Sequence, residues 1–347
     1  FDPDESGKAW QLAKSLQDEV GEAWAAYHFG IWAAEGEPEA AAEHAVAAAE
    51  KLKLPRLSQL ALTRQAWRLF NIDDYDGYVD HLRRGLEVIR TMPIPESFLG
   101  RAGRQFYPGE ASFRLNLWRA YRAKDNPEAQ GMFERGRALS RQYGGTLGEL
   151  AYLIDATPRF IEQGINADIA SQAEAMARKL RDPGWLARCL IAKSDALQGT
   201  RETKAAIEAA EEAAEIFKKT GSRGHYADCL FRRAGFRTQL NEFEKAEADF
   251  RQGVAIYREL GLTERSASAA LEAGTRLRSQ PAAALELLGE ALSDAEKSGN
   301  AKLIGDVLYR RGQTTLNDDP ASSVRDFLKA LSYAERANAE SEAPGGS

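Results

Sequence analysis

The stretch that shows the organisation of the chain most clearly is Asn241-Glu242-Phe243-Glu244-Lys245-Ala246. With Ala246 as the reference, small or short residues recur along the sequence, at Ala41, Ala129, Ala167, Ala206, Ala284 and Ser323, and Tyr78 fills the same place in one further unit. The steps between neighbouring positions are 37 to 40 residues, apart from one step of 51. A period this regular is typical of one supersecondary unit stacked about eight times, so we predict a solenoid and not a single compact core.

Each unit reads as two helices joined by a short turn. Around Ala246, the apolar spacing predicts a first helix from Arg223 to Gln239 and a second helix that begins at Phe243 and stops at Gly261. Antiparallel helices approach closely only where small residues meet. We expect the second helices to supply the recurring small residues, and the first helices to supply Gly30, Gly235, Gly274 and Gly312.

Units such as Ile216-Phe217-Lys218-Lys219-Thr220-Gly221, followed by Tyr226-Ala227-Asp228, resemble the tetratricopeptide-repeat (TPR) family. The resemblance is to the longer-period subclass found in kinesin light chains and in bacterial regulators of the STAND NTPase and maltose-activator type. It covers roughly residues 21 to 337 and implies an all-α, right-handed α-solenoid of about eight helix-turn-helix repeats, with the first helices lining a concave groove. The period is longer than the family's usual one of about 34 residues, and the aromatic and Leu-Gly signature of the first helix is degenerate.

Three segments depart from the repeat. Residues 1 to 20 are predicted to form an N-terminal capping helix or the remnant of a preceding unit. The step of 51 residues contains an insertion at about 92–109, which we interpret either as a loop on the binding face or as a longer helix pair with an irregular turn. Residues 338–347 are small and polar and are predicted to be a flexible tail. The first residue is Phe1 and not methionine, which favours a piece of a longer protein.

Signs of catalytic chemistry are few. No spacing of histidine, cysteine or carboxylate residues matches a metal site, and no phosphate-binding or nucleophile motif occurs. Cys189 and Cys229 lie one repeat apart and are predicted to be small buried residues of adjacent units, which fits a reducing cytoplasm. No apolar run approaches the length that a membrane span requires. We therefore expect a cytoplasmic protein that is not an enzyme and uses no cofactor or metal.

The charge distribution points to a kind of partner. The formal net charge is −6, yet the predicted first helices carry an excess of basic residues while the second helices are acidic. Arginine suits a groove that recognises carboxylate or phosphate, because its planar guanidinium can bind such a group in two places. The arginines that we predict to contact a partner are Arg64, Arg68, Arg114, Arg232, Arg233, Arg237, Arg276, Arg310 and Arg311. The equally weighted alternative is that these arginines pair with acids of adjacent second helices.

Two functions remain open at this point. The first is a protein–protein interaction scaffold that binds a partner protein or acidic peptide in an arginine-rich groove. The second is a sensor or oligomerisation arm of a larger regulatory protein, whose effector domain (a STAND-type NTPase, a protease or a transcription factor) lies elsewhere in the same chain. Nucleic acid is an unlikely partner because the isoelectric point is about 5.5.

Overall fold

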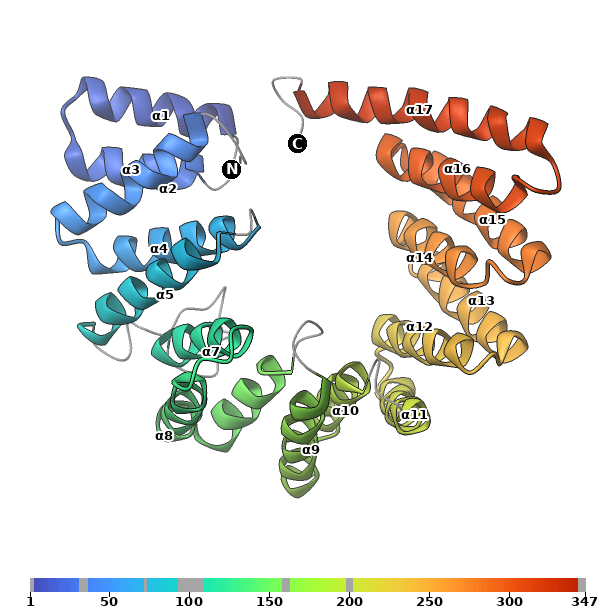
Figure 1. Cartoon of the computed structure of the whole chain (residues 1–347), viewed down its shortest axis with the longest axis horizontal. Helices are drawn as coiled ribbons and strands as arrows, with labels where there is room; N and C mark the ends of the chain where they lie inside the picture. The colour runs from blue at the N-terminus through green and yellow to red at the C-terminus, as the bar shows by residue number, and fades with distance from the viewer. Residues whose placement is uncertain are drawn as a thin grey trace. The chain divides into compact units, whose positions relative to one another are not determined.

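The computed structural model describes residues 3–30, 37–71, 74–92, 109–157, 163–197 and 202–342. Every regular element in these ranges is an α-helix, as Figure 1 shows. The chain divides into two compact units, unit 1 from Phe1 to Ala156 and unit 2 from Thr157 to Gly346.

Unit 1 is a row of helix hairpins in which each helix packs on its neighbours in the chain. Its helices are α1 (Pro3–Ser15), α2 (Glu19–Gly30), α3 (Glu37–Lys51), α4 (Pro55–Asn71), α5 (Tyr75–Arg90), α7 (Gly109–Arg122) and α8 (Ala129–Asp155). The first helix, α1, packs on α2, where Trp10 joins the cluster formed by Ala26, Ala45 and Leu62. The predicted cap is therefore a helix, but its role as a cap stays a prediction.

Unit 2 continues the same pattern. Its helices are α9 (Gln163–Leu180), α10 (Pro183–Ala196), α11 (Thr203–Lys219), α12 (Arg223–Gln239), α13 (Phe243–Glu259), α14 (Thr263–Arg276), α15 (Pro281–Ser298), α16 (Ala301–Thr315) and α17 (Pro320–Glu342). Besides the hairpin contacts, α12 touches α14 and α14 touches α16, so consecutive first helices are neighbours. In Figure 1, these three helices lie along one side of the unit and α13 and α15 along the other.

A break inside α8 divides it into the second helix of one repeat and the first helix of the next. The helix runs for 27 residues, but Gly145 has φ 61° and ψ −153°, a conformation that glycine adopts without steric cost. The residues before Gly145 form the second helix that begins at Ala129, and the residues after it precede α9 as a first helix in sequence order. With this division, each of the eight recurring positions lies in a second helix.

Left-handed residues end many of the helices. Gly221, Gly261 and Gly299 follow α11, α13 and α15 with φ of 71 to 73°, which confirms the predicted glycine stops. Asn241 takes the same conformation (φ 59°) in the turn between α12 and α13, and Arg181 does so (φ 55°) between α9 and α10. The short turns therefore share the left-handed conformation, which glycine adopts at the lowest cost but which Asn241 and Arg181 also adopt.

The small recurring positions do lie in the core. Ala41, Ala206, Ala246, Ala284 and Ser323 have no exposed surface. A Cβ atom added to Gly274 would lie 2.7 Å from Leu288 Cγ and 3.0 Å from the Ala284 carbonyl oxygen, so this glycine permits the close approach of α14 and α15. Gly30 and Gly312 face similarly close contacts with Ala42 and Phe327. These contacts confirm the predicted role of small residues at three of the four glycines.

The expectation for Gly235 is wrong by one residue. The three atoms nearest to a Cβ there all belong to the side chain of Arg276 on α14, the first of them 3.3 Å away, and none of these three belongs to the second helix α13. Its neighbour Ala234 is buried instead in the cluster that contains Ala246 and Ala273. One residue rotates a helical position by about 100°, so Gly235 lies on a different face of α12 from the one that packs on α13.

Helix α17 continues to Glu342, so five residues of the predicted tail, 338–342, are helical, and the rest of that tail lies outside the described residues. The predicted insertion at about 92–109 also lies outside them, apart from Met92 and Gly109. The all-α solenoid of helix-turn-helix repeats is confirmed.

Candidate functional site

Three adjoining pockets form a groove along the first helices of unit 2. The first pocket, of about 430 Å³, shares Ser268, Glu272 and Arg276 with the second, of about 600 Å³. The second shares Thr275 and Arg310 with the third, of about 710 Å³. We call this continuous surface the unit-2 groove.

The groove uses one face of each of three successive helices. Its residues on α12 recur with the spacing i, i+3, i+4, i+7, i+8 and i+11, as do those on α16. The α12 set is Asp228, Phe231, Arg232, Gly235, Phe236 and Gln239. The α16 set is Asp306, Tyr309, Arg310, Gln313 and Thr314, and Asn317 continues the same spacing in the turn that follows the helix. Helix α14 lies between them and contributes Arg265, Ser268, Ala269, Glu272, Thr275 and Arg276. The stacking of the repeats therefore builds a ladder of equivalent positions.

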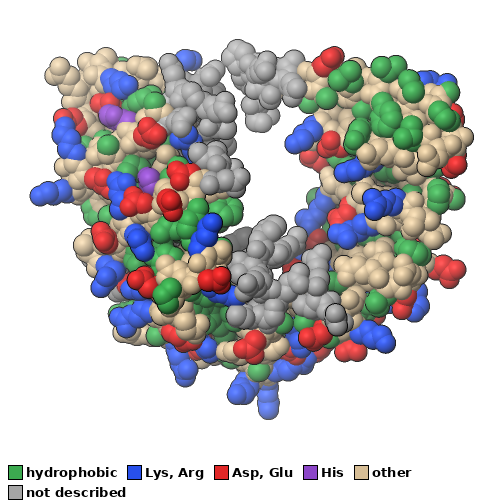
Figure 2. Space-filling model, viewed as in Figure 1, with side chains coloured by type: hydrophobic (Ala, Val, Ile, Leu, Met, Phe, Trp, Pro, Cys, Tyr) green, Lys and Arg blue, Asp and Glu red, His purple; other side chains and the backbone are tan. Residues whose placement is uncertain are grey.

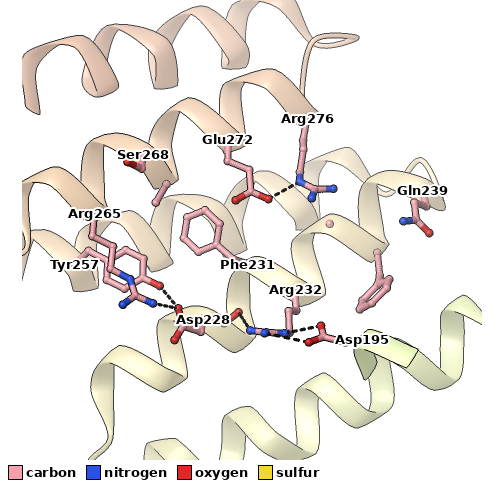
Figure 3. A pocket seen from close by; sticks show the side chains of 13 residues that line it. Asp195, Asp228, Phe231, Arg232, Gln239, Tyr257, Arg265, Ser268, Glu272 and Arg276 are labelled. Carbon is pink, nitrogen blue, oxygen red and sulfur yellow. Dashed lines mark hydrogen bonds and ion pairs between the residues drawn. The ribbon is translucent and has the colours of Figure 1, made fainter. Parts of the chain in front are cut away.

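In the first pocket, the charged side chains are already paired. Figure 3 shows Arg265 and the Tyr257 hydroxyl both directed at Asp228, with which each forms a hydrogen bond. Arg232 binds both carboxylate oxygens of Asp195 on α10, at 2.8 and 3.2 Å. Burial and the hydrogen bond to Asp228 raise the pKa of Tyr257 far above its usual value, so this hydroxyl stays a donor. The pocket thus presents satisfied ion pairs around the aromatic ring of Phe231.

The third pocket differs because, within the described part of the chain, its two arginines form no ion pair. Among the described residues, no carboxylate lies within 4.0 Å of the guanidinium of Arg310, which donates a hydrogen bond to Gln313 Oε1 at 2.9 Å and lies over the ring of Tyr309. Arg278 lines the same pocket and likewise has no carboxylate that close in the described ranges. Gln313, Asn317 and the carboxylate of Asp318 line the same pocket. This end of the groove can accept a carboxylate or phosphate without first breaking an ion pair.

Three of the predicted arginines bind neighbouring helices. Arg233 and Arg237 on α12 both contact the carboxylate of Asp249 on α13, at 2.5 to 2.8 Å, and both reach Glu211 on α11, at 3.4 and 3.1 Å. Arg311 on α16 binds both oxygens of Asp326 on α17 at 2.7 Å. These contacts with acids of second helices are the alternative that the sequence left open.

Arg276 and Arg232 each line the groove and also bind a carboxylate. Arg276 lines the first two pockets but binds Glu272 of its own helix at 2.8 Å. Arg232 lines the first pocket and binds Asp195 on α10, the first helix of the preceding repeat. Over the three pockets, five arginines and five carboxylates line the unit-2 groove, so its charge is balanced, and Figure 2 shows blue and red side chains together on this side of the unit.

The remaining predicted arginines belong to unit 1. Arg64 and Arg68 lie on α4, where Arg64 is exposed and Arg68 is half-buried. Arg114 lies on α7, largely buried, and binds Glu110 of the same helix at 2.9 Å. Sequence reasoning did not select Asp228, Tyr257 and Arg265, which meet only because α12, α13 and α14 pack together. Their participation in partner binding, like that of all nine arginines, stays a prediction.

The described residues also bear on three other possibilities: a metal site, a reactive cysteine and a membrane-spanning helix. In the described ranges, no three residues among histidine, cysteine, aspartate and glutamate cluster as metal ligands would. Cys189 and Cys229 are both buried, without a disulfide, and burial raises the pKa of each thiol to about 12, as expected of small core residues. None of the described helices is both long and apolar enough to cross a membrane.

The fold and the groove define a class of protein: an α-solenoid of TPR-like helical repeats with a groove on its first helices. Among solved structures, the chain is similar to a Signal Transduction ATPase with Numerous Domains (STAND) protein with a tetratricopeptide repeat sensor from Pyrococcus horikoshii. The TM-score is 0.51 and the identity 12%, over 95% of this chain and 51% of that one. The chain thus spans about half the length of that protein, and the likeness concerns the fold alone.

Two further solved structures have lower TM-scores. BtubC from P. vanneervenii has a TM-score of 0.44 and 19% identity, over 69% of this chain and 91% of that one. A Rap protein complexed with Competence and Sporulation Factor has a TM-score of 0.41 and 12% identity, over 97% and 95%. No protein-family model matches the chain, and no curated protein matches it in sequence.

Proposed function

We propose that the chain is a binding module that holds an extended segment of a partner protein or peptide in the unit-2 groove. The observation that carries this proposal is the alignment of three pockets along equivalent faces of α12, α14 and α16. An extended peptide suits such a surface because its length matches a row of subsites, whereas a compact ligand would use only one. An interaction scaffold of this kind needs no catalytic group.

The chemistry of the pockets suggests how such a segment would be oriented. An acidic group of the peptide would bind at Arg310 and Arg278, where among the described residues no carboxylate competes within 4.0 Å. The first pocket, with its paired charges, would accept backbone amides and an apolar side chain over Phe231. The partner is therefore acidic at one end only. This proposal is narrower than the sequence-based hypothesis of an arginine-rich groove, because it assigns the acidic contact to one end of the unit-2 groove.

A peptide display experiment tests the proposal. Random twelve-residue peptides displayed on phage would be selected on the whole chain, and a selected peptide, labelled with fluorescein, would be titrated by fluorescence anisotropy. The variant Arg278→Glu/Arg310→Glu should weaken binding by at least about tenfold, since a lost charge-assisted contact costs about 1.5 to 3 kcal/mol. The matched control is Lys219→Glu, a charge reversal at an exposed site on the second helix α11. Unchanged affinity in the groove variant, or selection of no peptide that binds unit 2, would refute the proposal.

The second function, a sensor or oligomerisation arm of a longer regulatory protein, also stays a proposal. It does not conflict with the first, because a sensor arm must also bind its signal. The full open reading frame around this chain decides it. An adjoining nucleotide-binding, protease or DNA-binding domain would support it, and its absence would leave the scaffold alone. Cytoplasmic location is likewise a prediction, which fractionation of the source cells would check.

A further inference from the structure

The last helix of unit 2 carries an apolar stripe that faces solvent. Val324, Leu328 and Leu331 on α17 are 53%, 63% and 57% exposed. Their spacing of four and three residues places them on one side of the helix, and Figure 2 shows hydrophobic side chains gathered over this part of unit 2. Large aliphatic side chains in one exposed row are unusual on a protein surface and typically mark an interface.

The equivalent positions on α13 and α15 show how this side of a second helix packs in the preceding repeats. One and two repeats earlier, the position of Leu331 is taken by Leu292 on α15, which packs partly buried against the core, and by Val254 on α13, which is 1% exposed. The position of Leu328 is taken by Gly289 on α15 and by Arg251 on α13, and Arg251 reaches Glu286 and Glu290 on the next second helix, α15. The stripe on α17 therefore lies on the side that meets another helix in the interior of unit 2, and the charged residue of α13 is here replaced by leucine.

We propose that the stripe is a dimerisation surface, and that α17 of one copy packs antiparallel on α17 of a second copy. A two-fold axis near the centre of the stripe places Leu328 of each copy opposite Leu331 of the other. In the same register, Glu335 of one copy lies beside Arg325 of the other, and this contact occurs twice by symmetry. Both residues are exposed on α17. A 4-3-4 spacing from Val324 to Glu335 is the spacing of a two-helix seam, and closed two-fold dimers are the commonest way in which an apolar patch is covered.

A second copy is favoured over another partner because the stripe is complementary to itself. Its apolar centre meets an identical apolar centre, and its basic residue at one end meets the acidic residue at the other. The competing arrangement within a homo-oligomer is a head-to-tail contact with the end of α1, where Leu12 on the helix and Leu16 just after it are 59% and 68% exposed. That contact would not close on itself and would produce longer assemblies.

Sedimentation equilibrium of the whole chain tests the proposal over about 1 to 100 µM, the range in which modest interfaces associate. We expect the mass to rise from 38.2 kDa towards twice that value. Leu328→Glu/Leu331→Glu should stay monomeric with unchanged helical content by circular dichroism, since both side chains are exposed. Leu12→Glu/Leu16→Glu should dimerise as the wild type does. A wild type that stays at the monomer mass, or a dimer that only the α1 variant abolishes, would overturn the proposal.

Charge reversal separates the antiparallel register from other ways of covering the stripe. Arg325→Glu alone and Glu335→Arg alone should each weaken the dimer, because each brings like charges together at both ends. A mixture of the two variants should form a heterodimer, in which both ends again pair opposite charges. Because these changes are at exposed sites, they remain informative even if the leucine variant unfolds. If the mixture dimerised as weakly as each variant alone, then Arg325 and Glu335 would not meet, and the proposed register would be wrong.

Discussion

The carboxylate of Asp249 joins α12 and α13 through two arginines, and its removal leads to a quantitative prediction. The side chain is 6% exposed and accepts three hydrogen bonds of 2.5 to 2.8 Å from Arg233 and Arg237. Asp249→Asn keeps the shape but removes the charge. Breaking a fully buried pair costs about 3 to 5 kcal/mol because an uncompensated charge remains.

Two features reduce that figure here. The side chains of Arg233 and Arg237 are 20% and 16% exposed, and both guanidinium groups also reach Glu211. Part of their charge therefore stays compensated, and we expect a loss of about 2 to 3 kcal/mol in the free energy of unfolding. The matched control is Glu247→Gln, whose partner Arg251 keeps Glu286 and Glu290. With both side chains of this pair about one-third exposed, the control should cost at most about 0.5 kcal/mol.

Urea unfolding followed by circular dichroism at pH 7 measures both variants. The Asp249 variant should lower the midpoint clearly more than the control, and it should act on unit 2 because each repeat contacts only its neighbours. Equal midpoints for the two variants would refute the reasoning that burial, and not the mere presence of an ion pair, sets the contribution.

Three shorter predictions follow from other features of the fold. Burial raises the pKa of the Asp294 carboxyl, but hydrogen bonds from an arginine, a serine and a lysine outweigh it and leave the pKa below its usual value. Its stabilising contribution is thus present above the unfolded pKa of about 3.9 and is lost as pH falls, so Asp294→Asn should lose less stability than the wild type between pH 7 and about 3.5 in urea titrations. Cys189 and Cys229, whose pKa values burial raises to about 12, should react with a thiol reagent at pH 8 only after unfolding, and rapid reaction of the native chain would contradict their burial. Gly261→Ala should cost about 1 kcal/mol in unfolding free energy because its φ is 71°, while Arg181→Gly, with φ 55°, should be neutral or stabilising.

The sequence predicted the repeat because the repeat is a property of spacing. Each unit buries a small residue at the same place, so the period appears directly in the chain, and the bounds of α12 agree with the predicted helix at both ends. The positions of side chains around each helix were harder to predict. At Gly235, the register was wrong by one residue, which exchanged the face that packs on α13 for the face that lines the groove.

The same sensitivity to a shift of one residue explains why the sequence could not show which arginines line the groove and which pair with neighbouring helices. Arg232 and Arg233 are adjacent, yet one lines the first pocket and the other binds Asp249. Neighbouring residues on a helix point about 100° apart, so a basic pair always divides between two faces. The partner of Arg233 lies on the second helix of the same repeat, whereas the partner of Arg232, Asp195, lies one repeat earlier. Only the packed structure shows which face meets which helix.

The adjacent pair Arg310 and Arg311 turns this division into a test of the groove. Arg310 lines two pockets and has no carboxylate within 4.0 Å in the described part of the chain, whereas Arg311 binds both oxygens of Asp326, which is 6% exposed. Arg310→Gln should therefore weaken the selected peptide while changing the free energy of unfolding by less than about 0.5 kcal/mol. Arg311→Gln should cost about 2 kcal/mol in urea unfolding, because Asp326 stays buried without its partner, and it should leave the affinity of the folded protein unchanged. If both substitutions affected binding and stability alike, then α16 would not separate a binding face from a packing face, and the groove would lose the residue on which its acidic specificity depends.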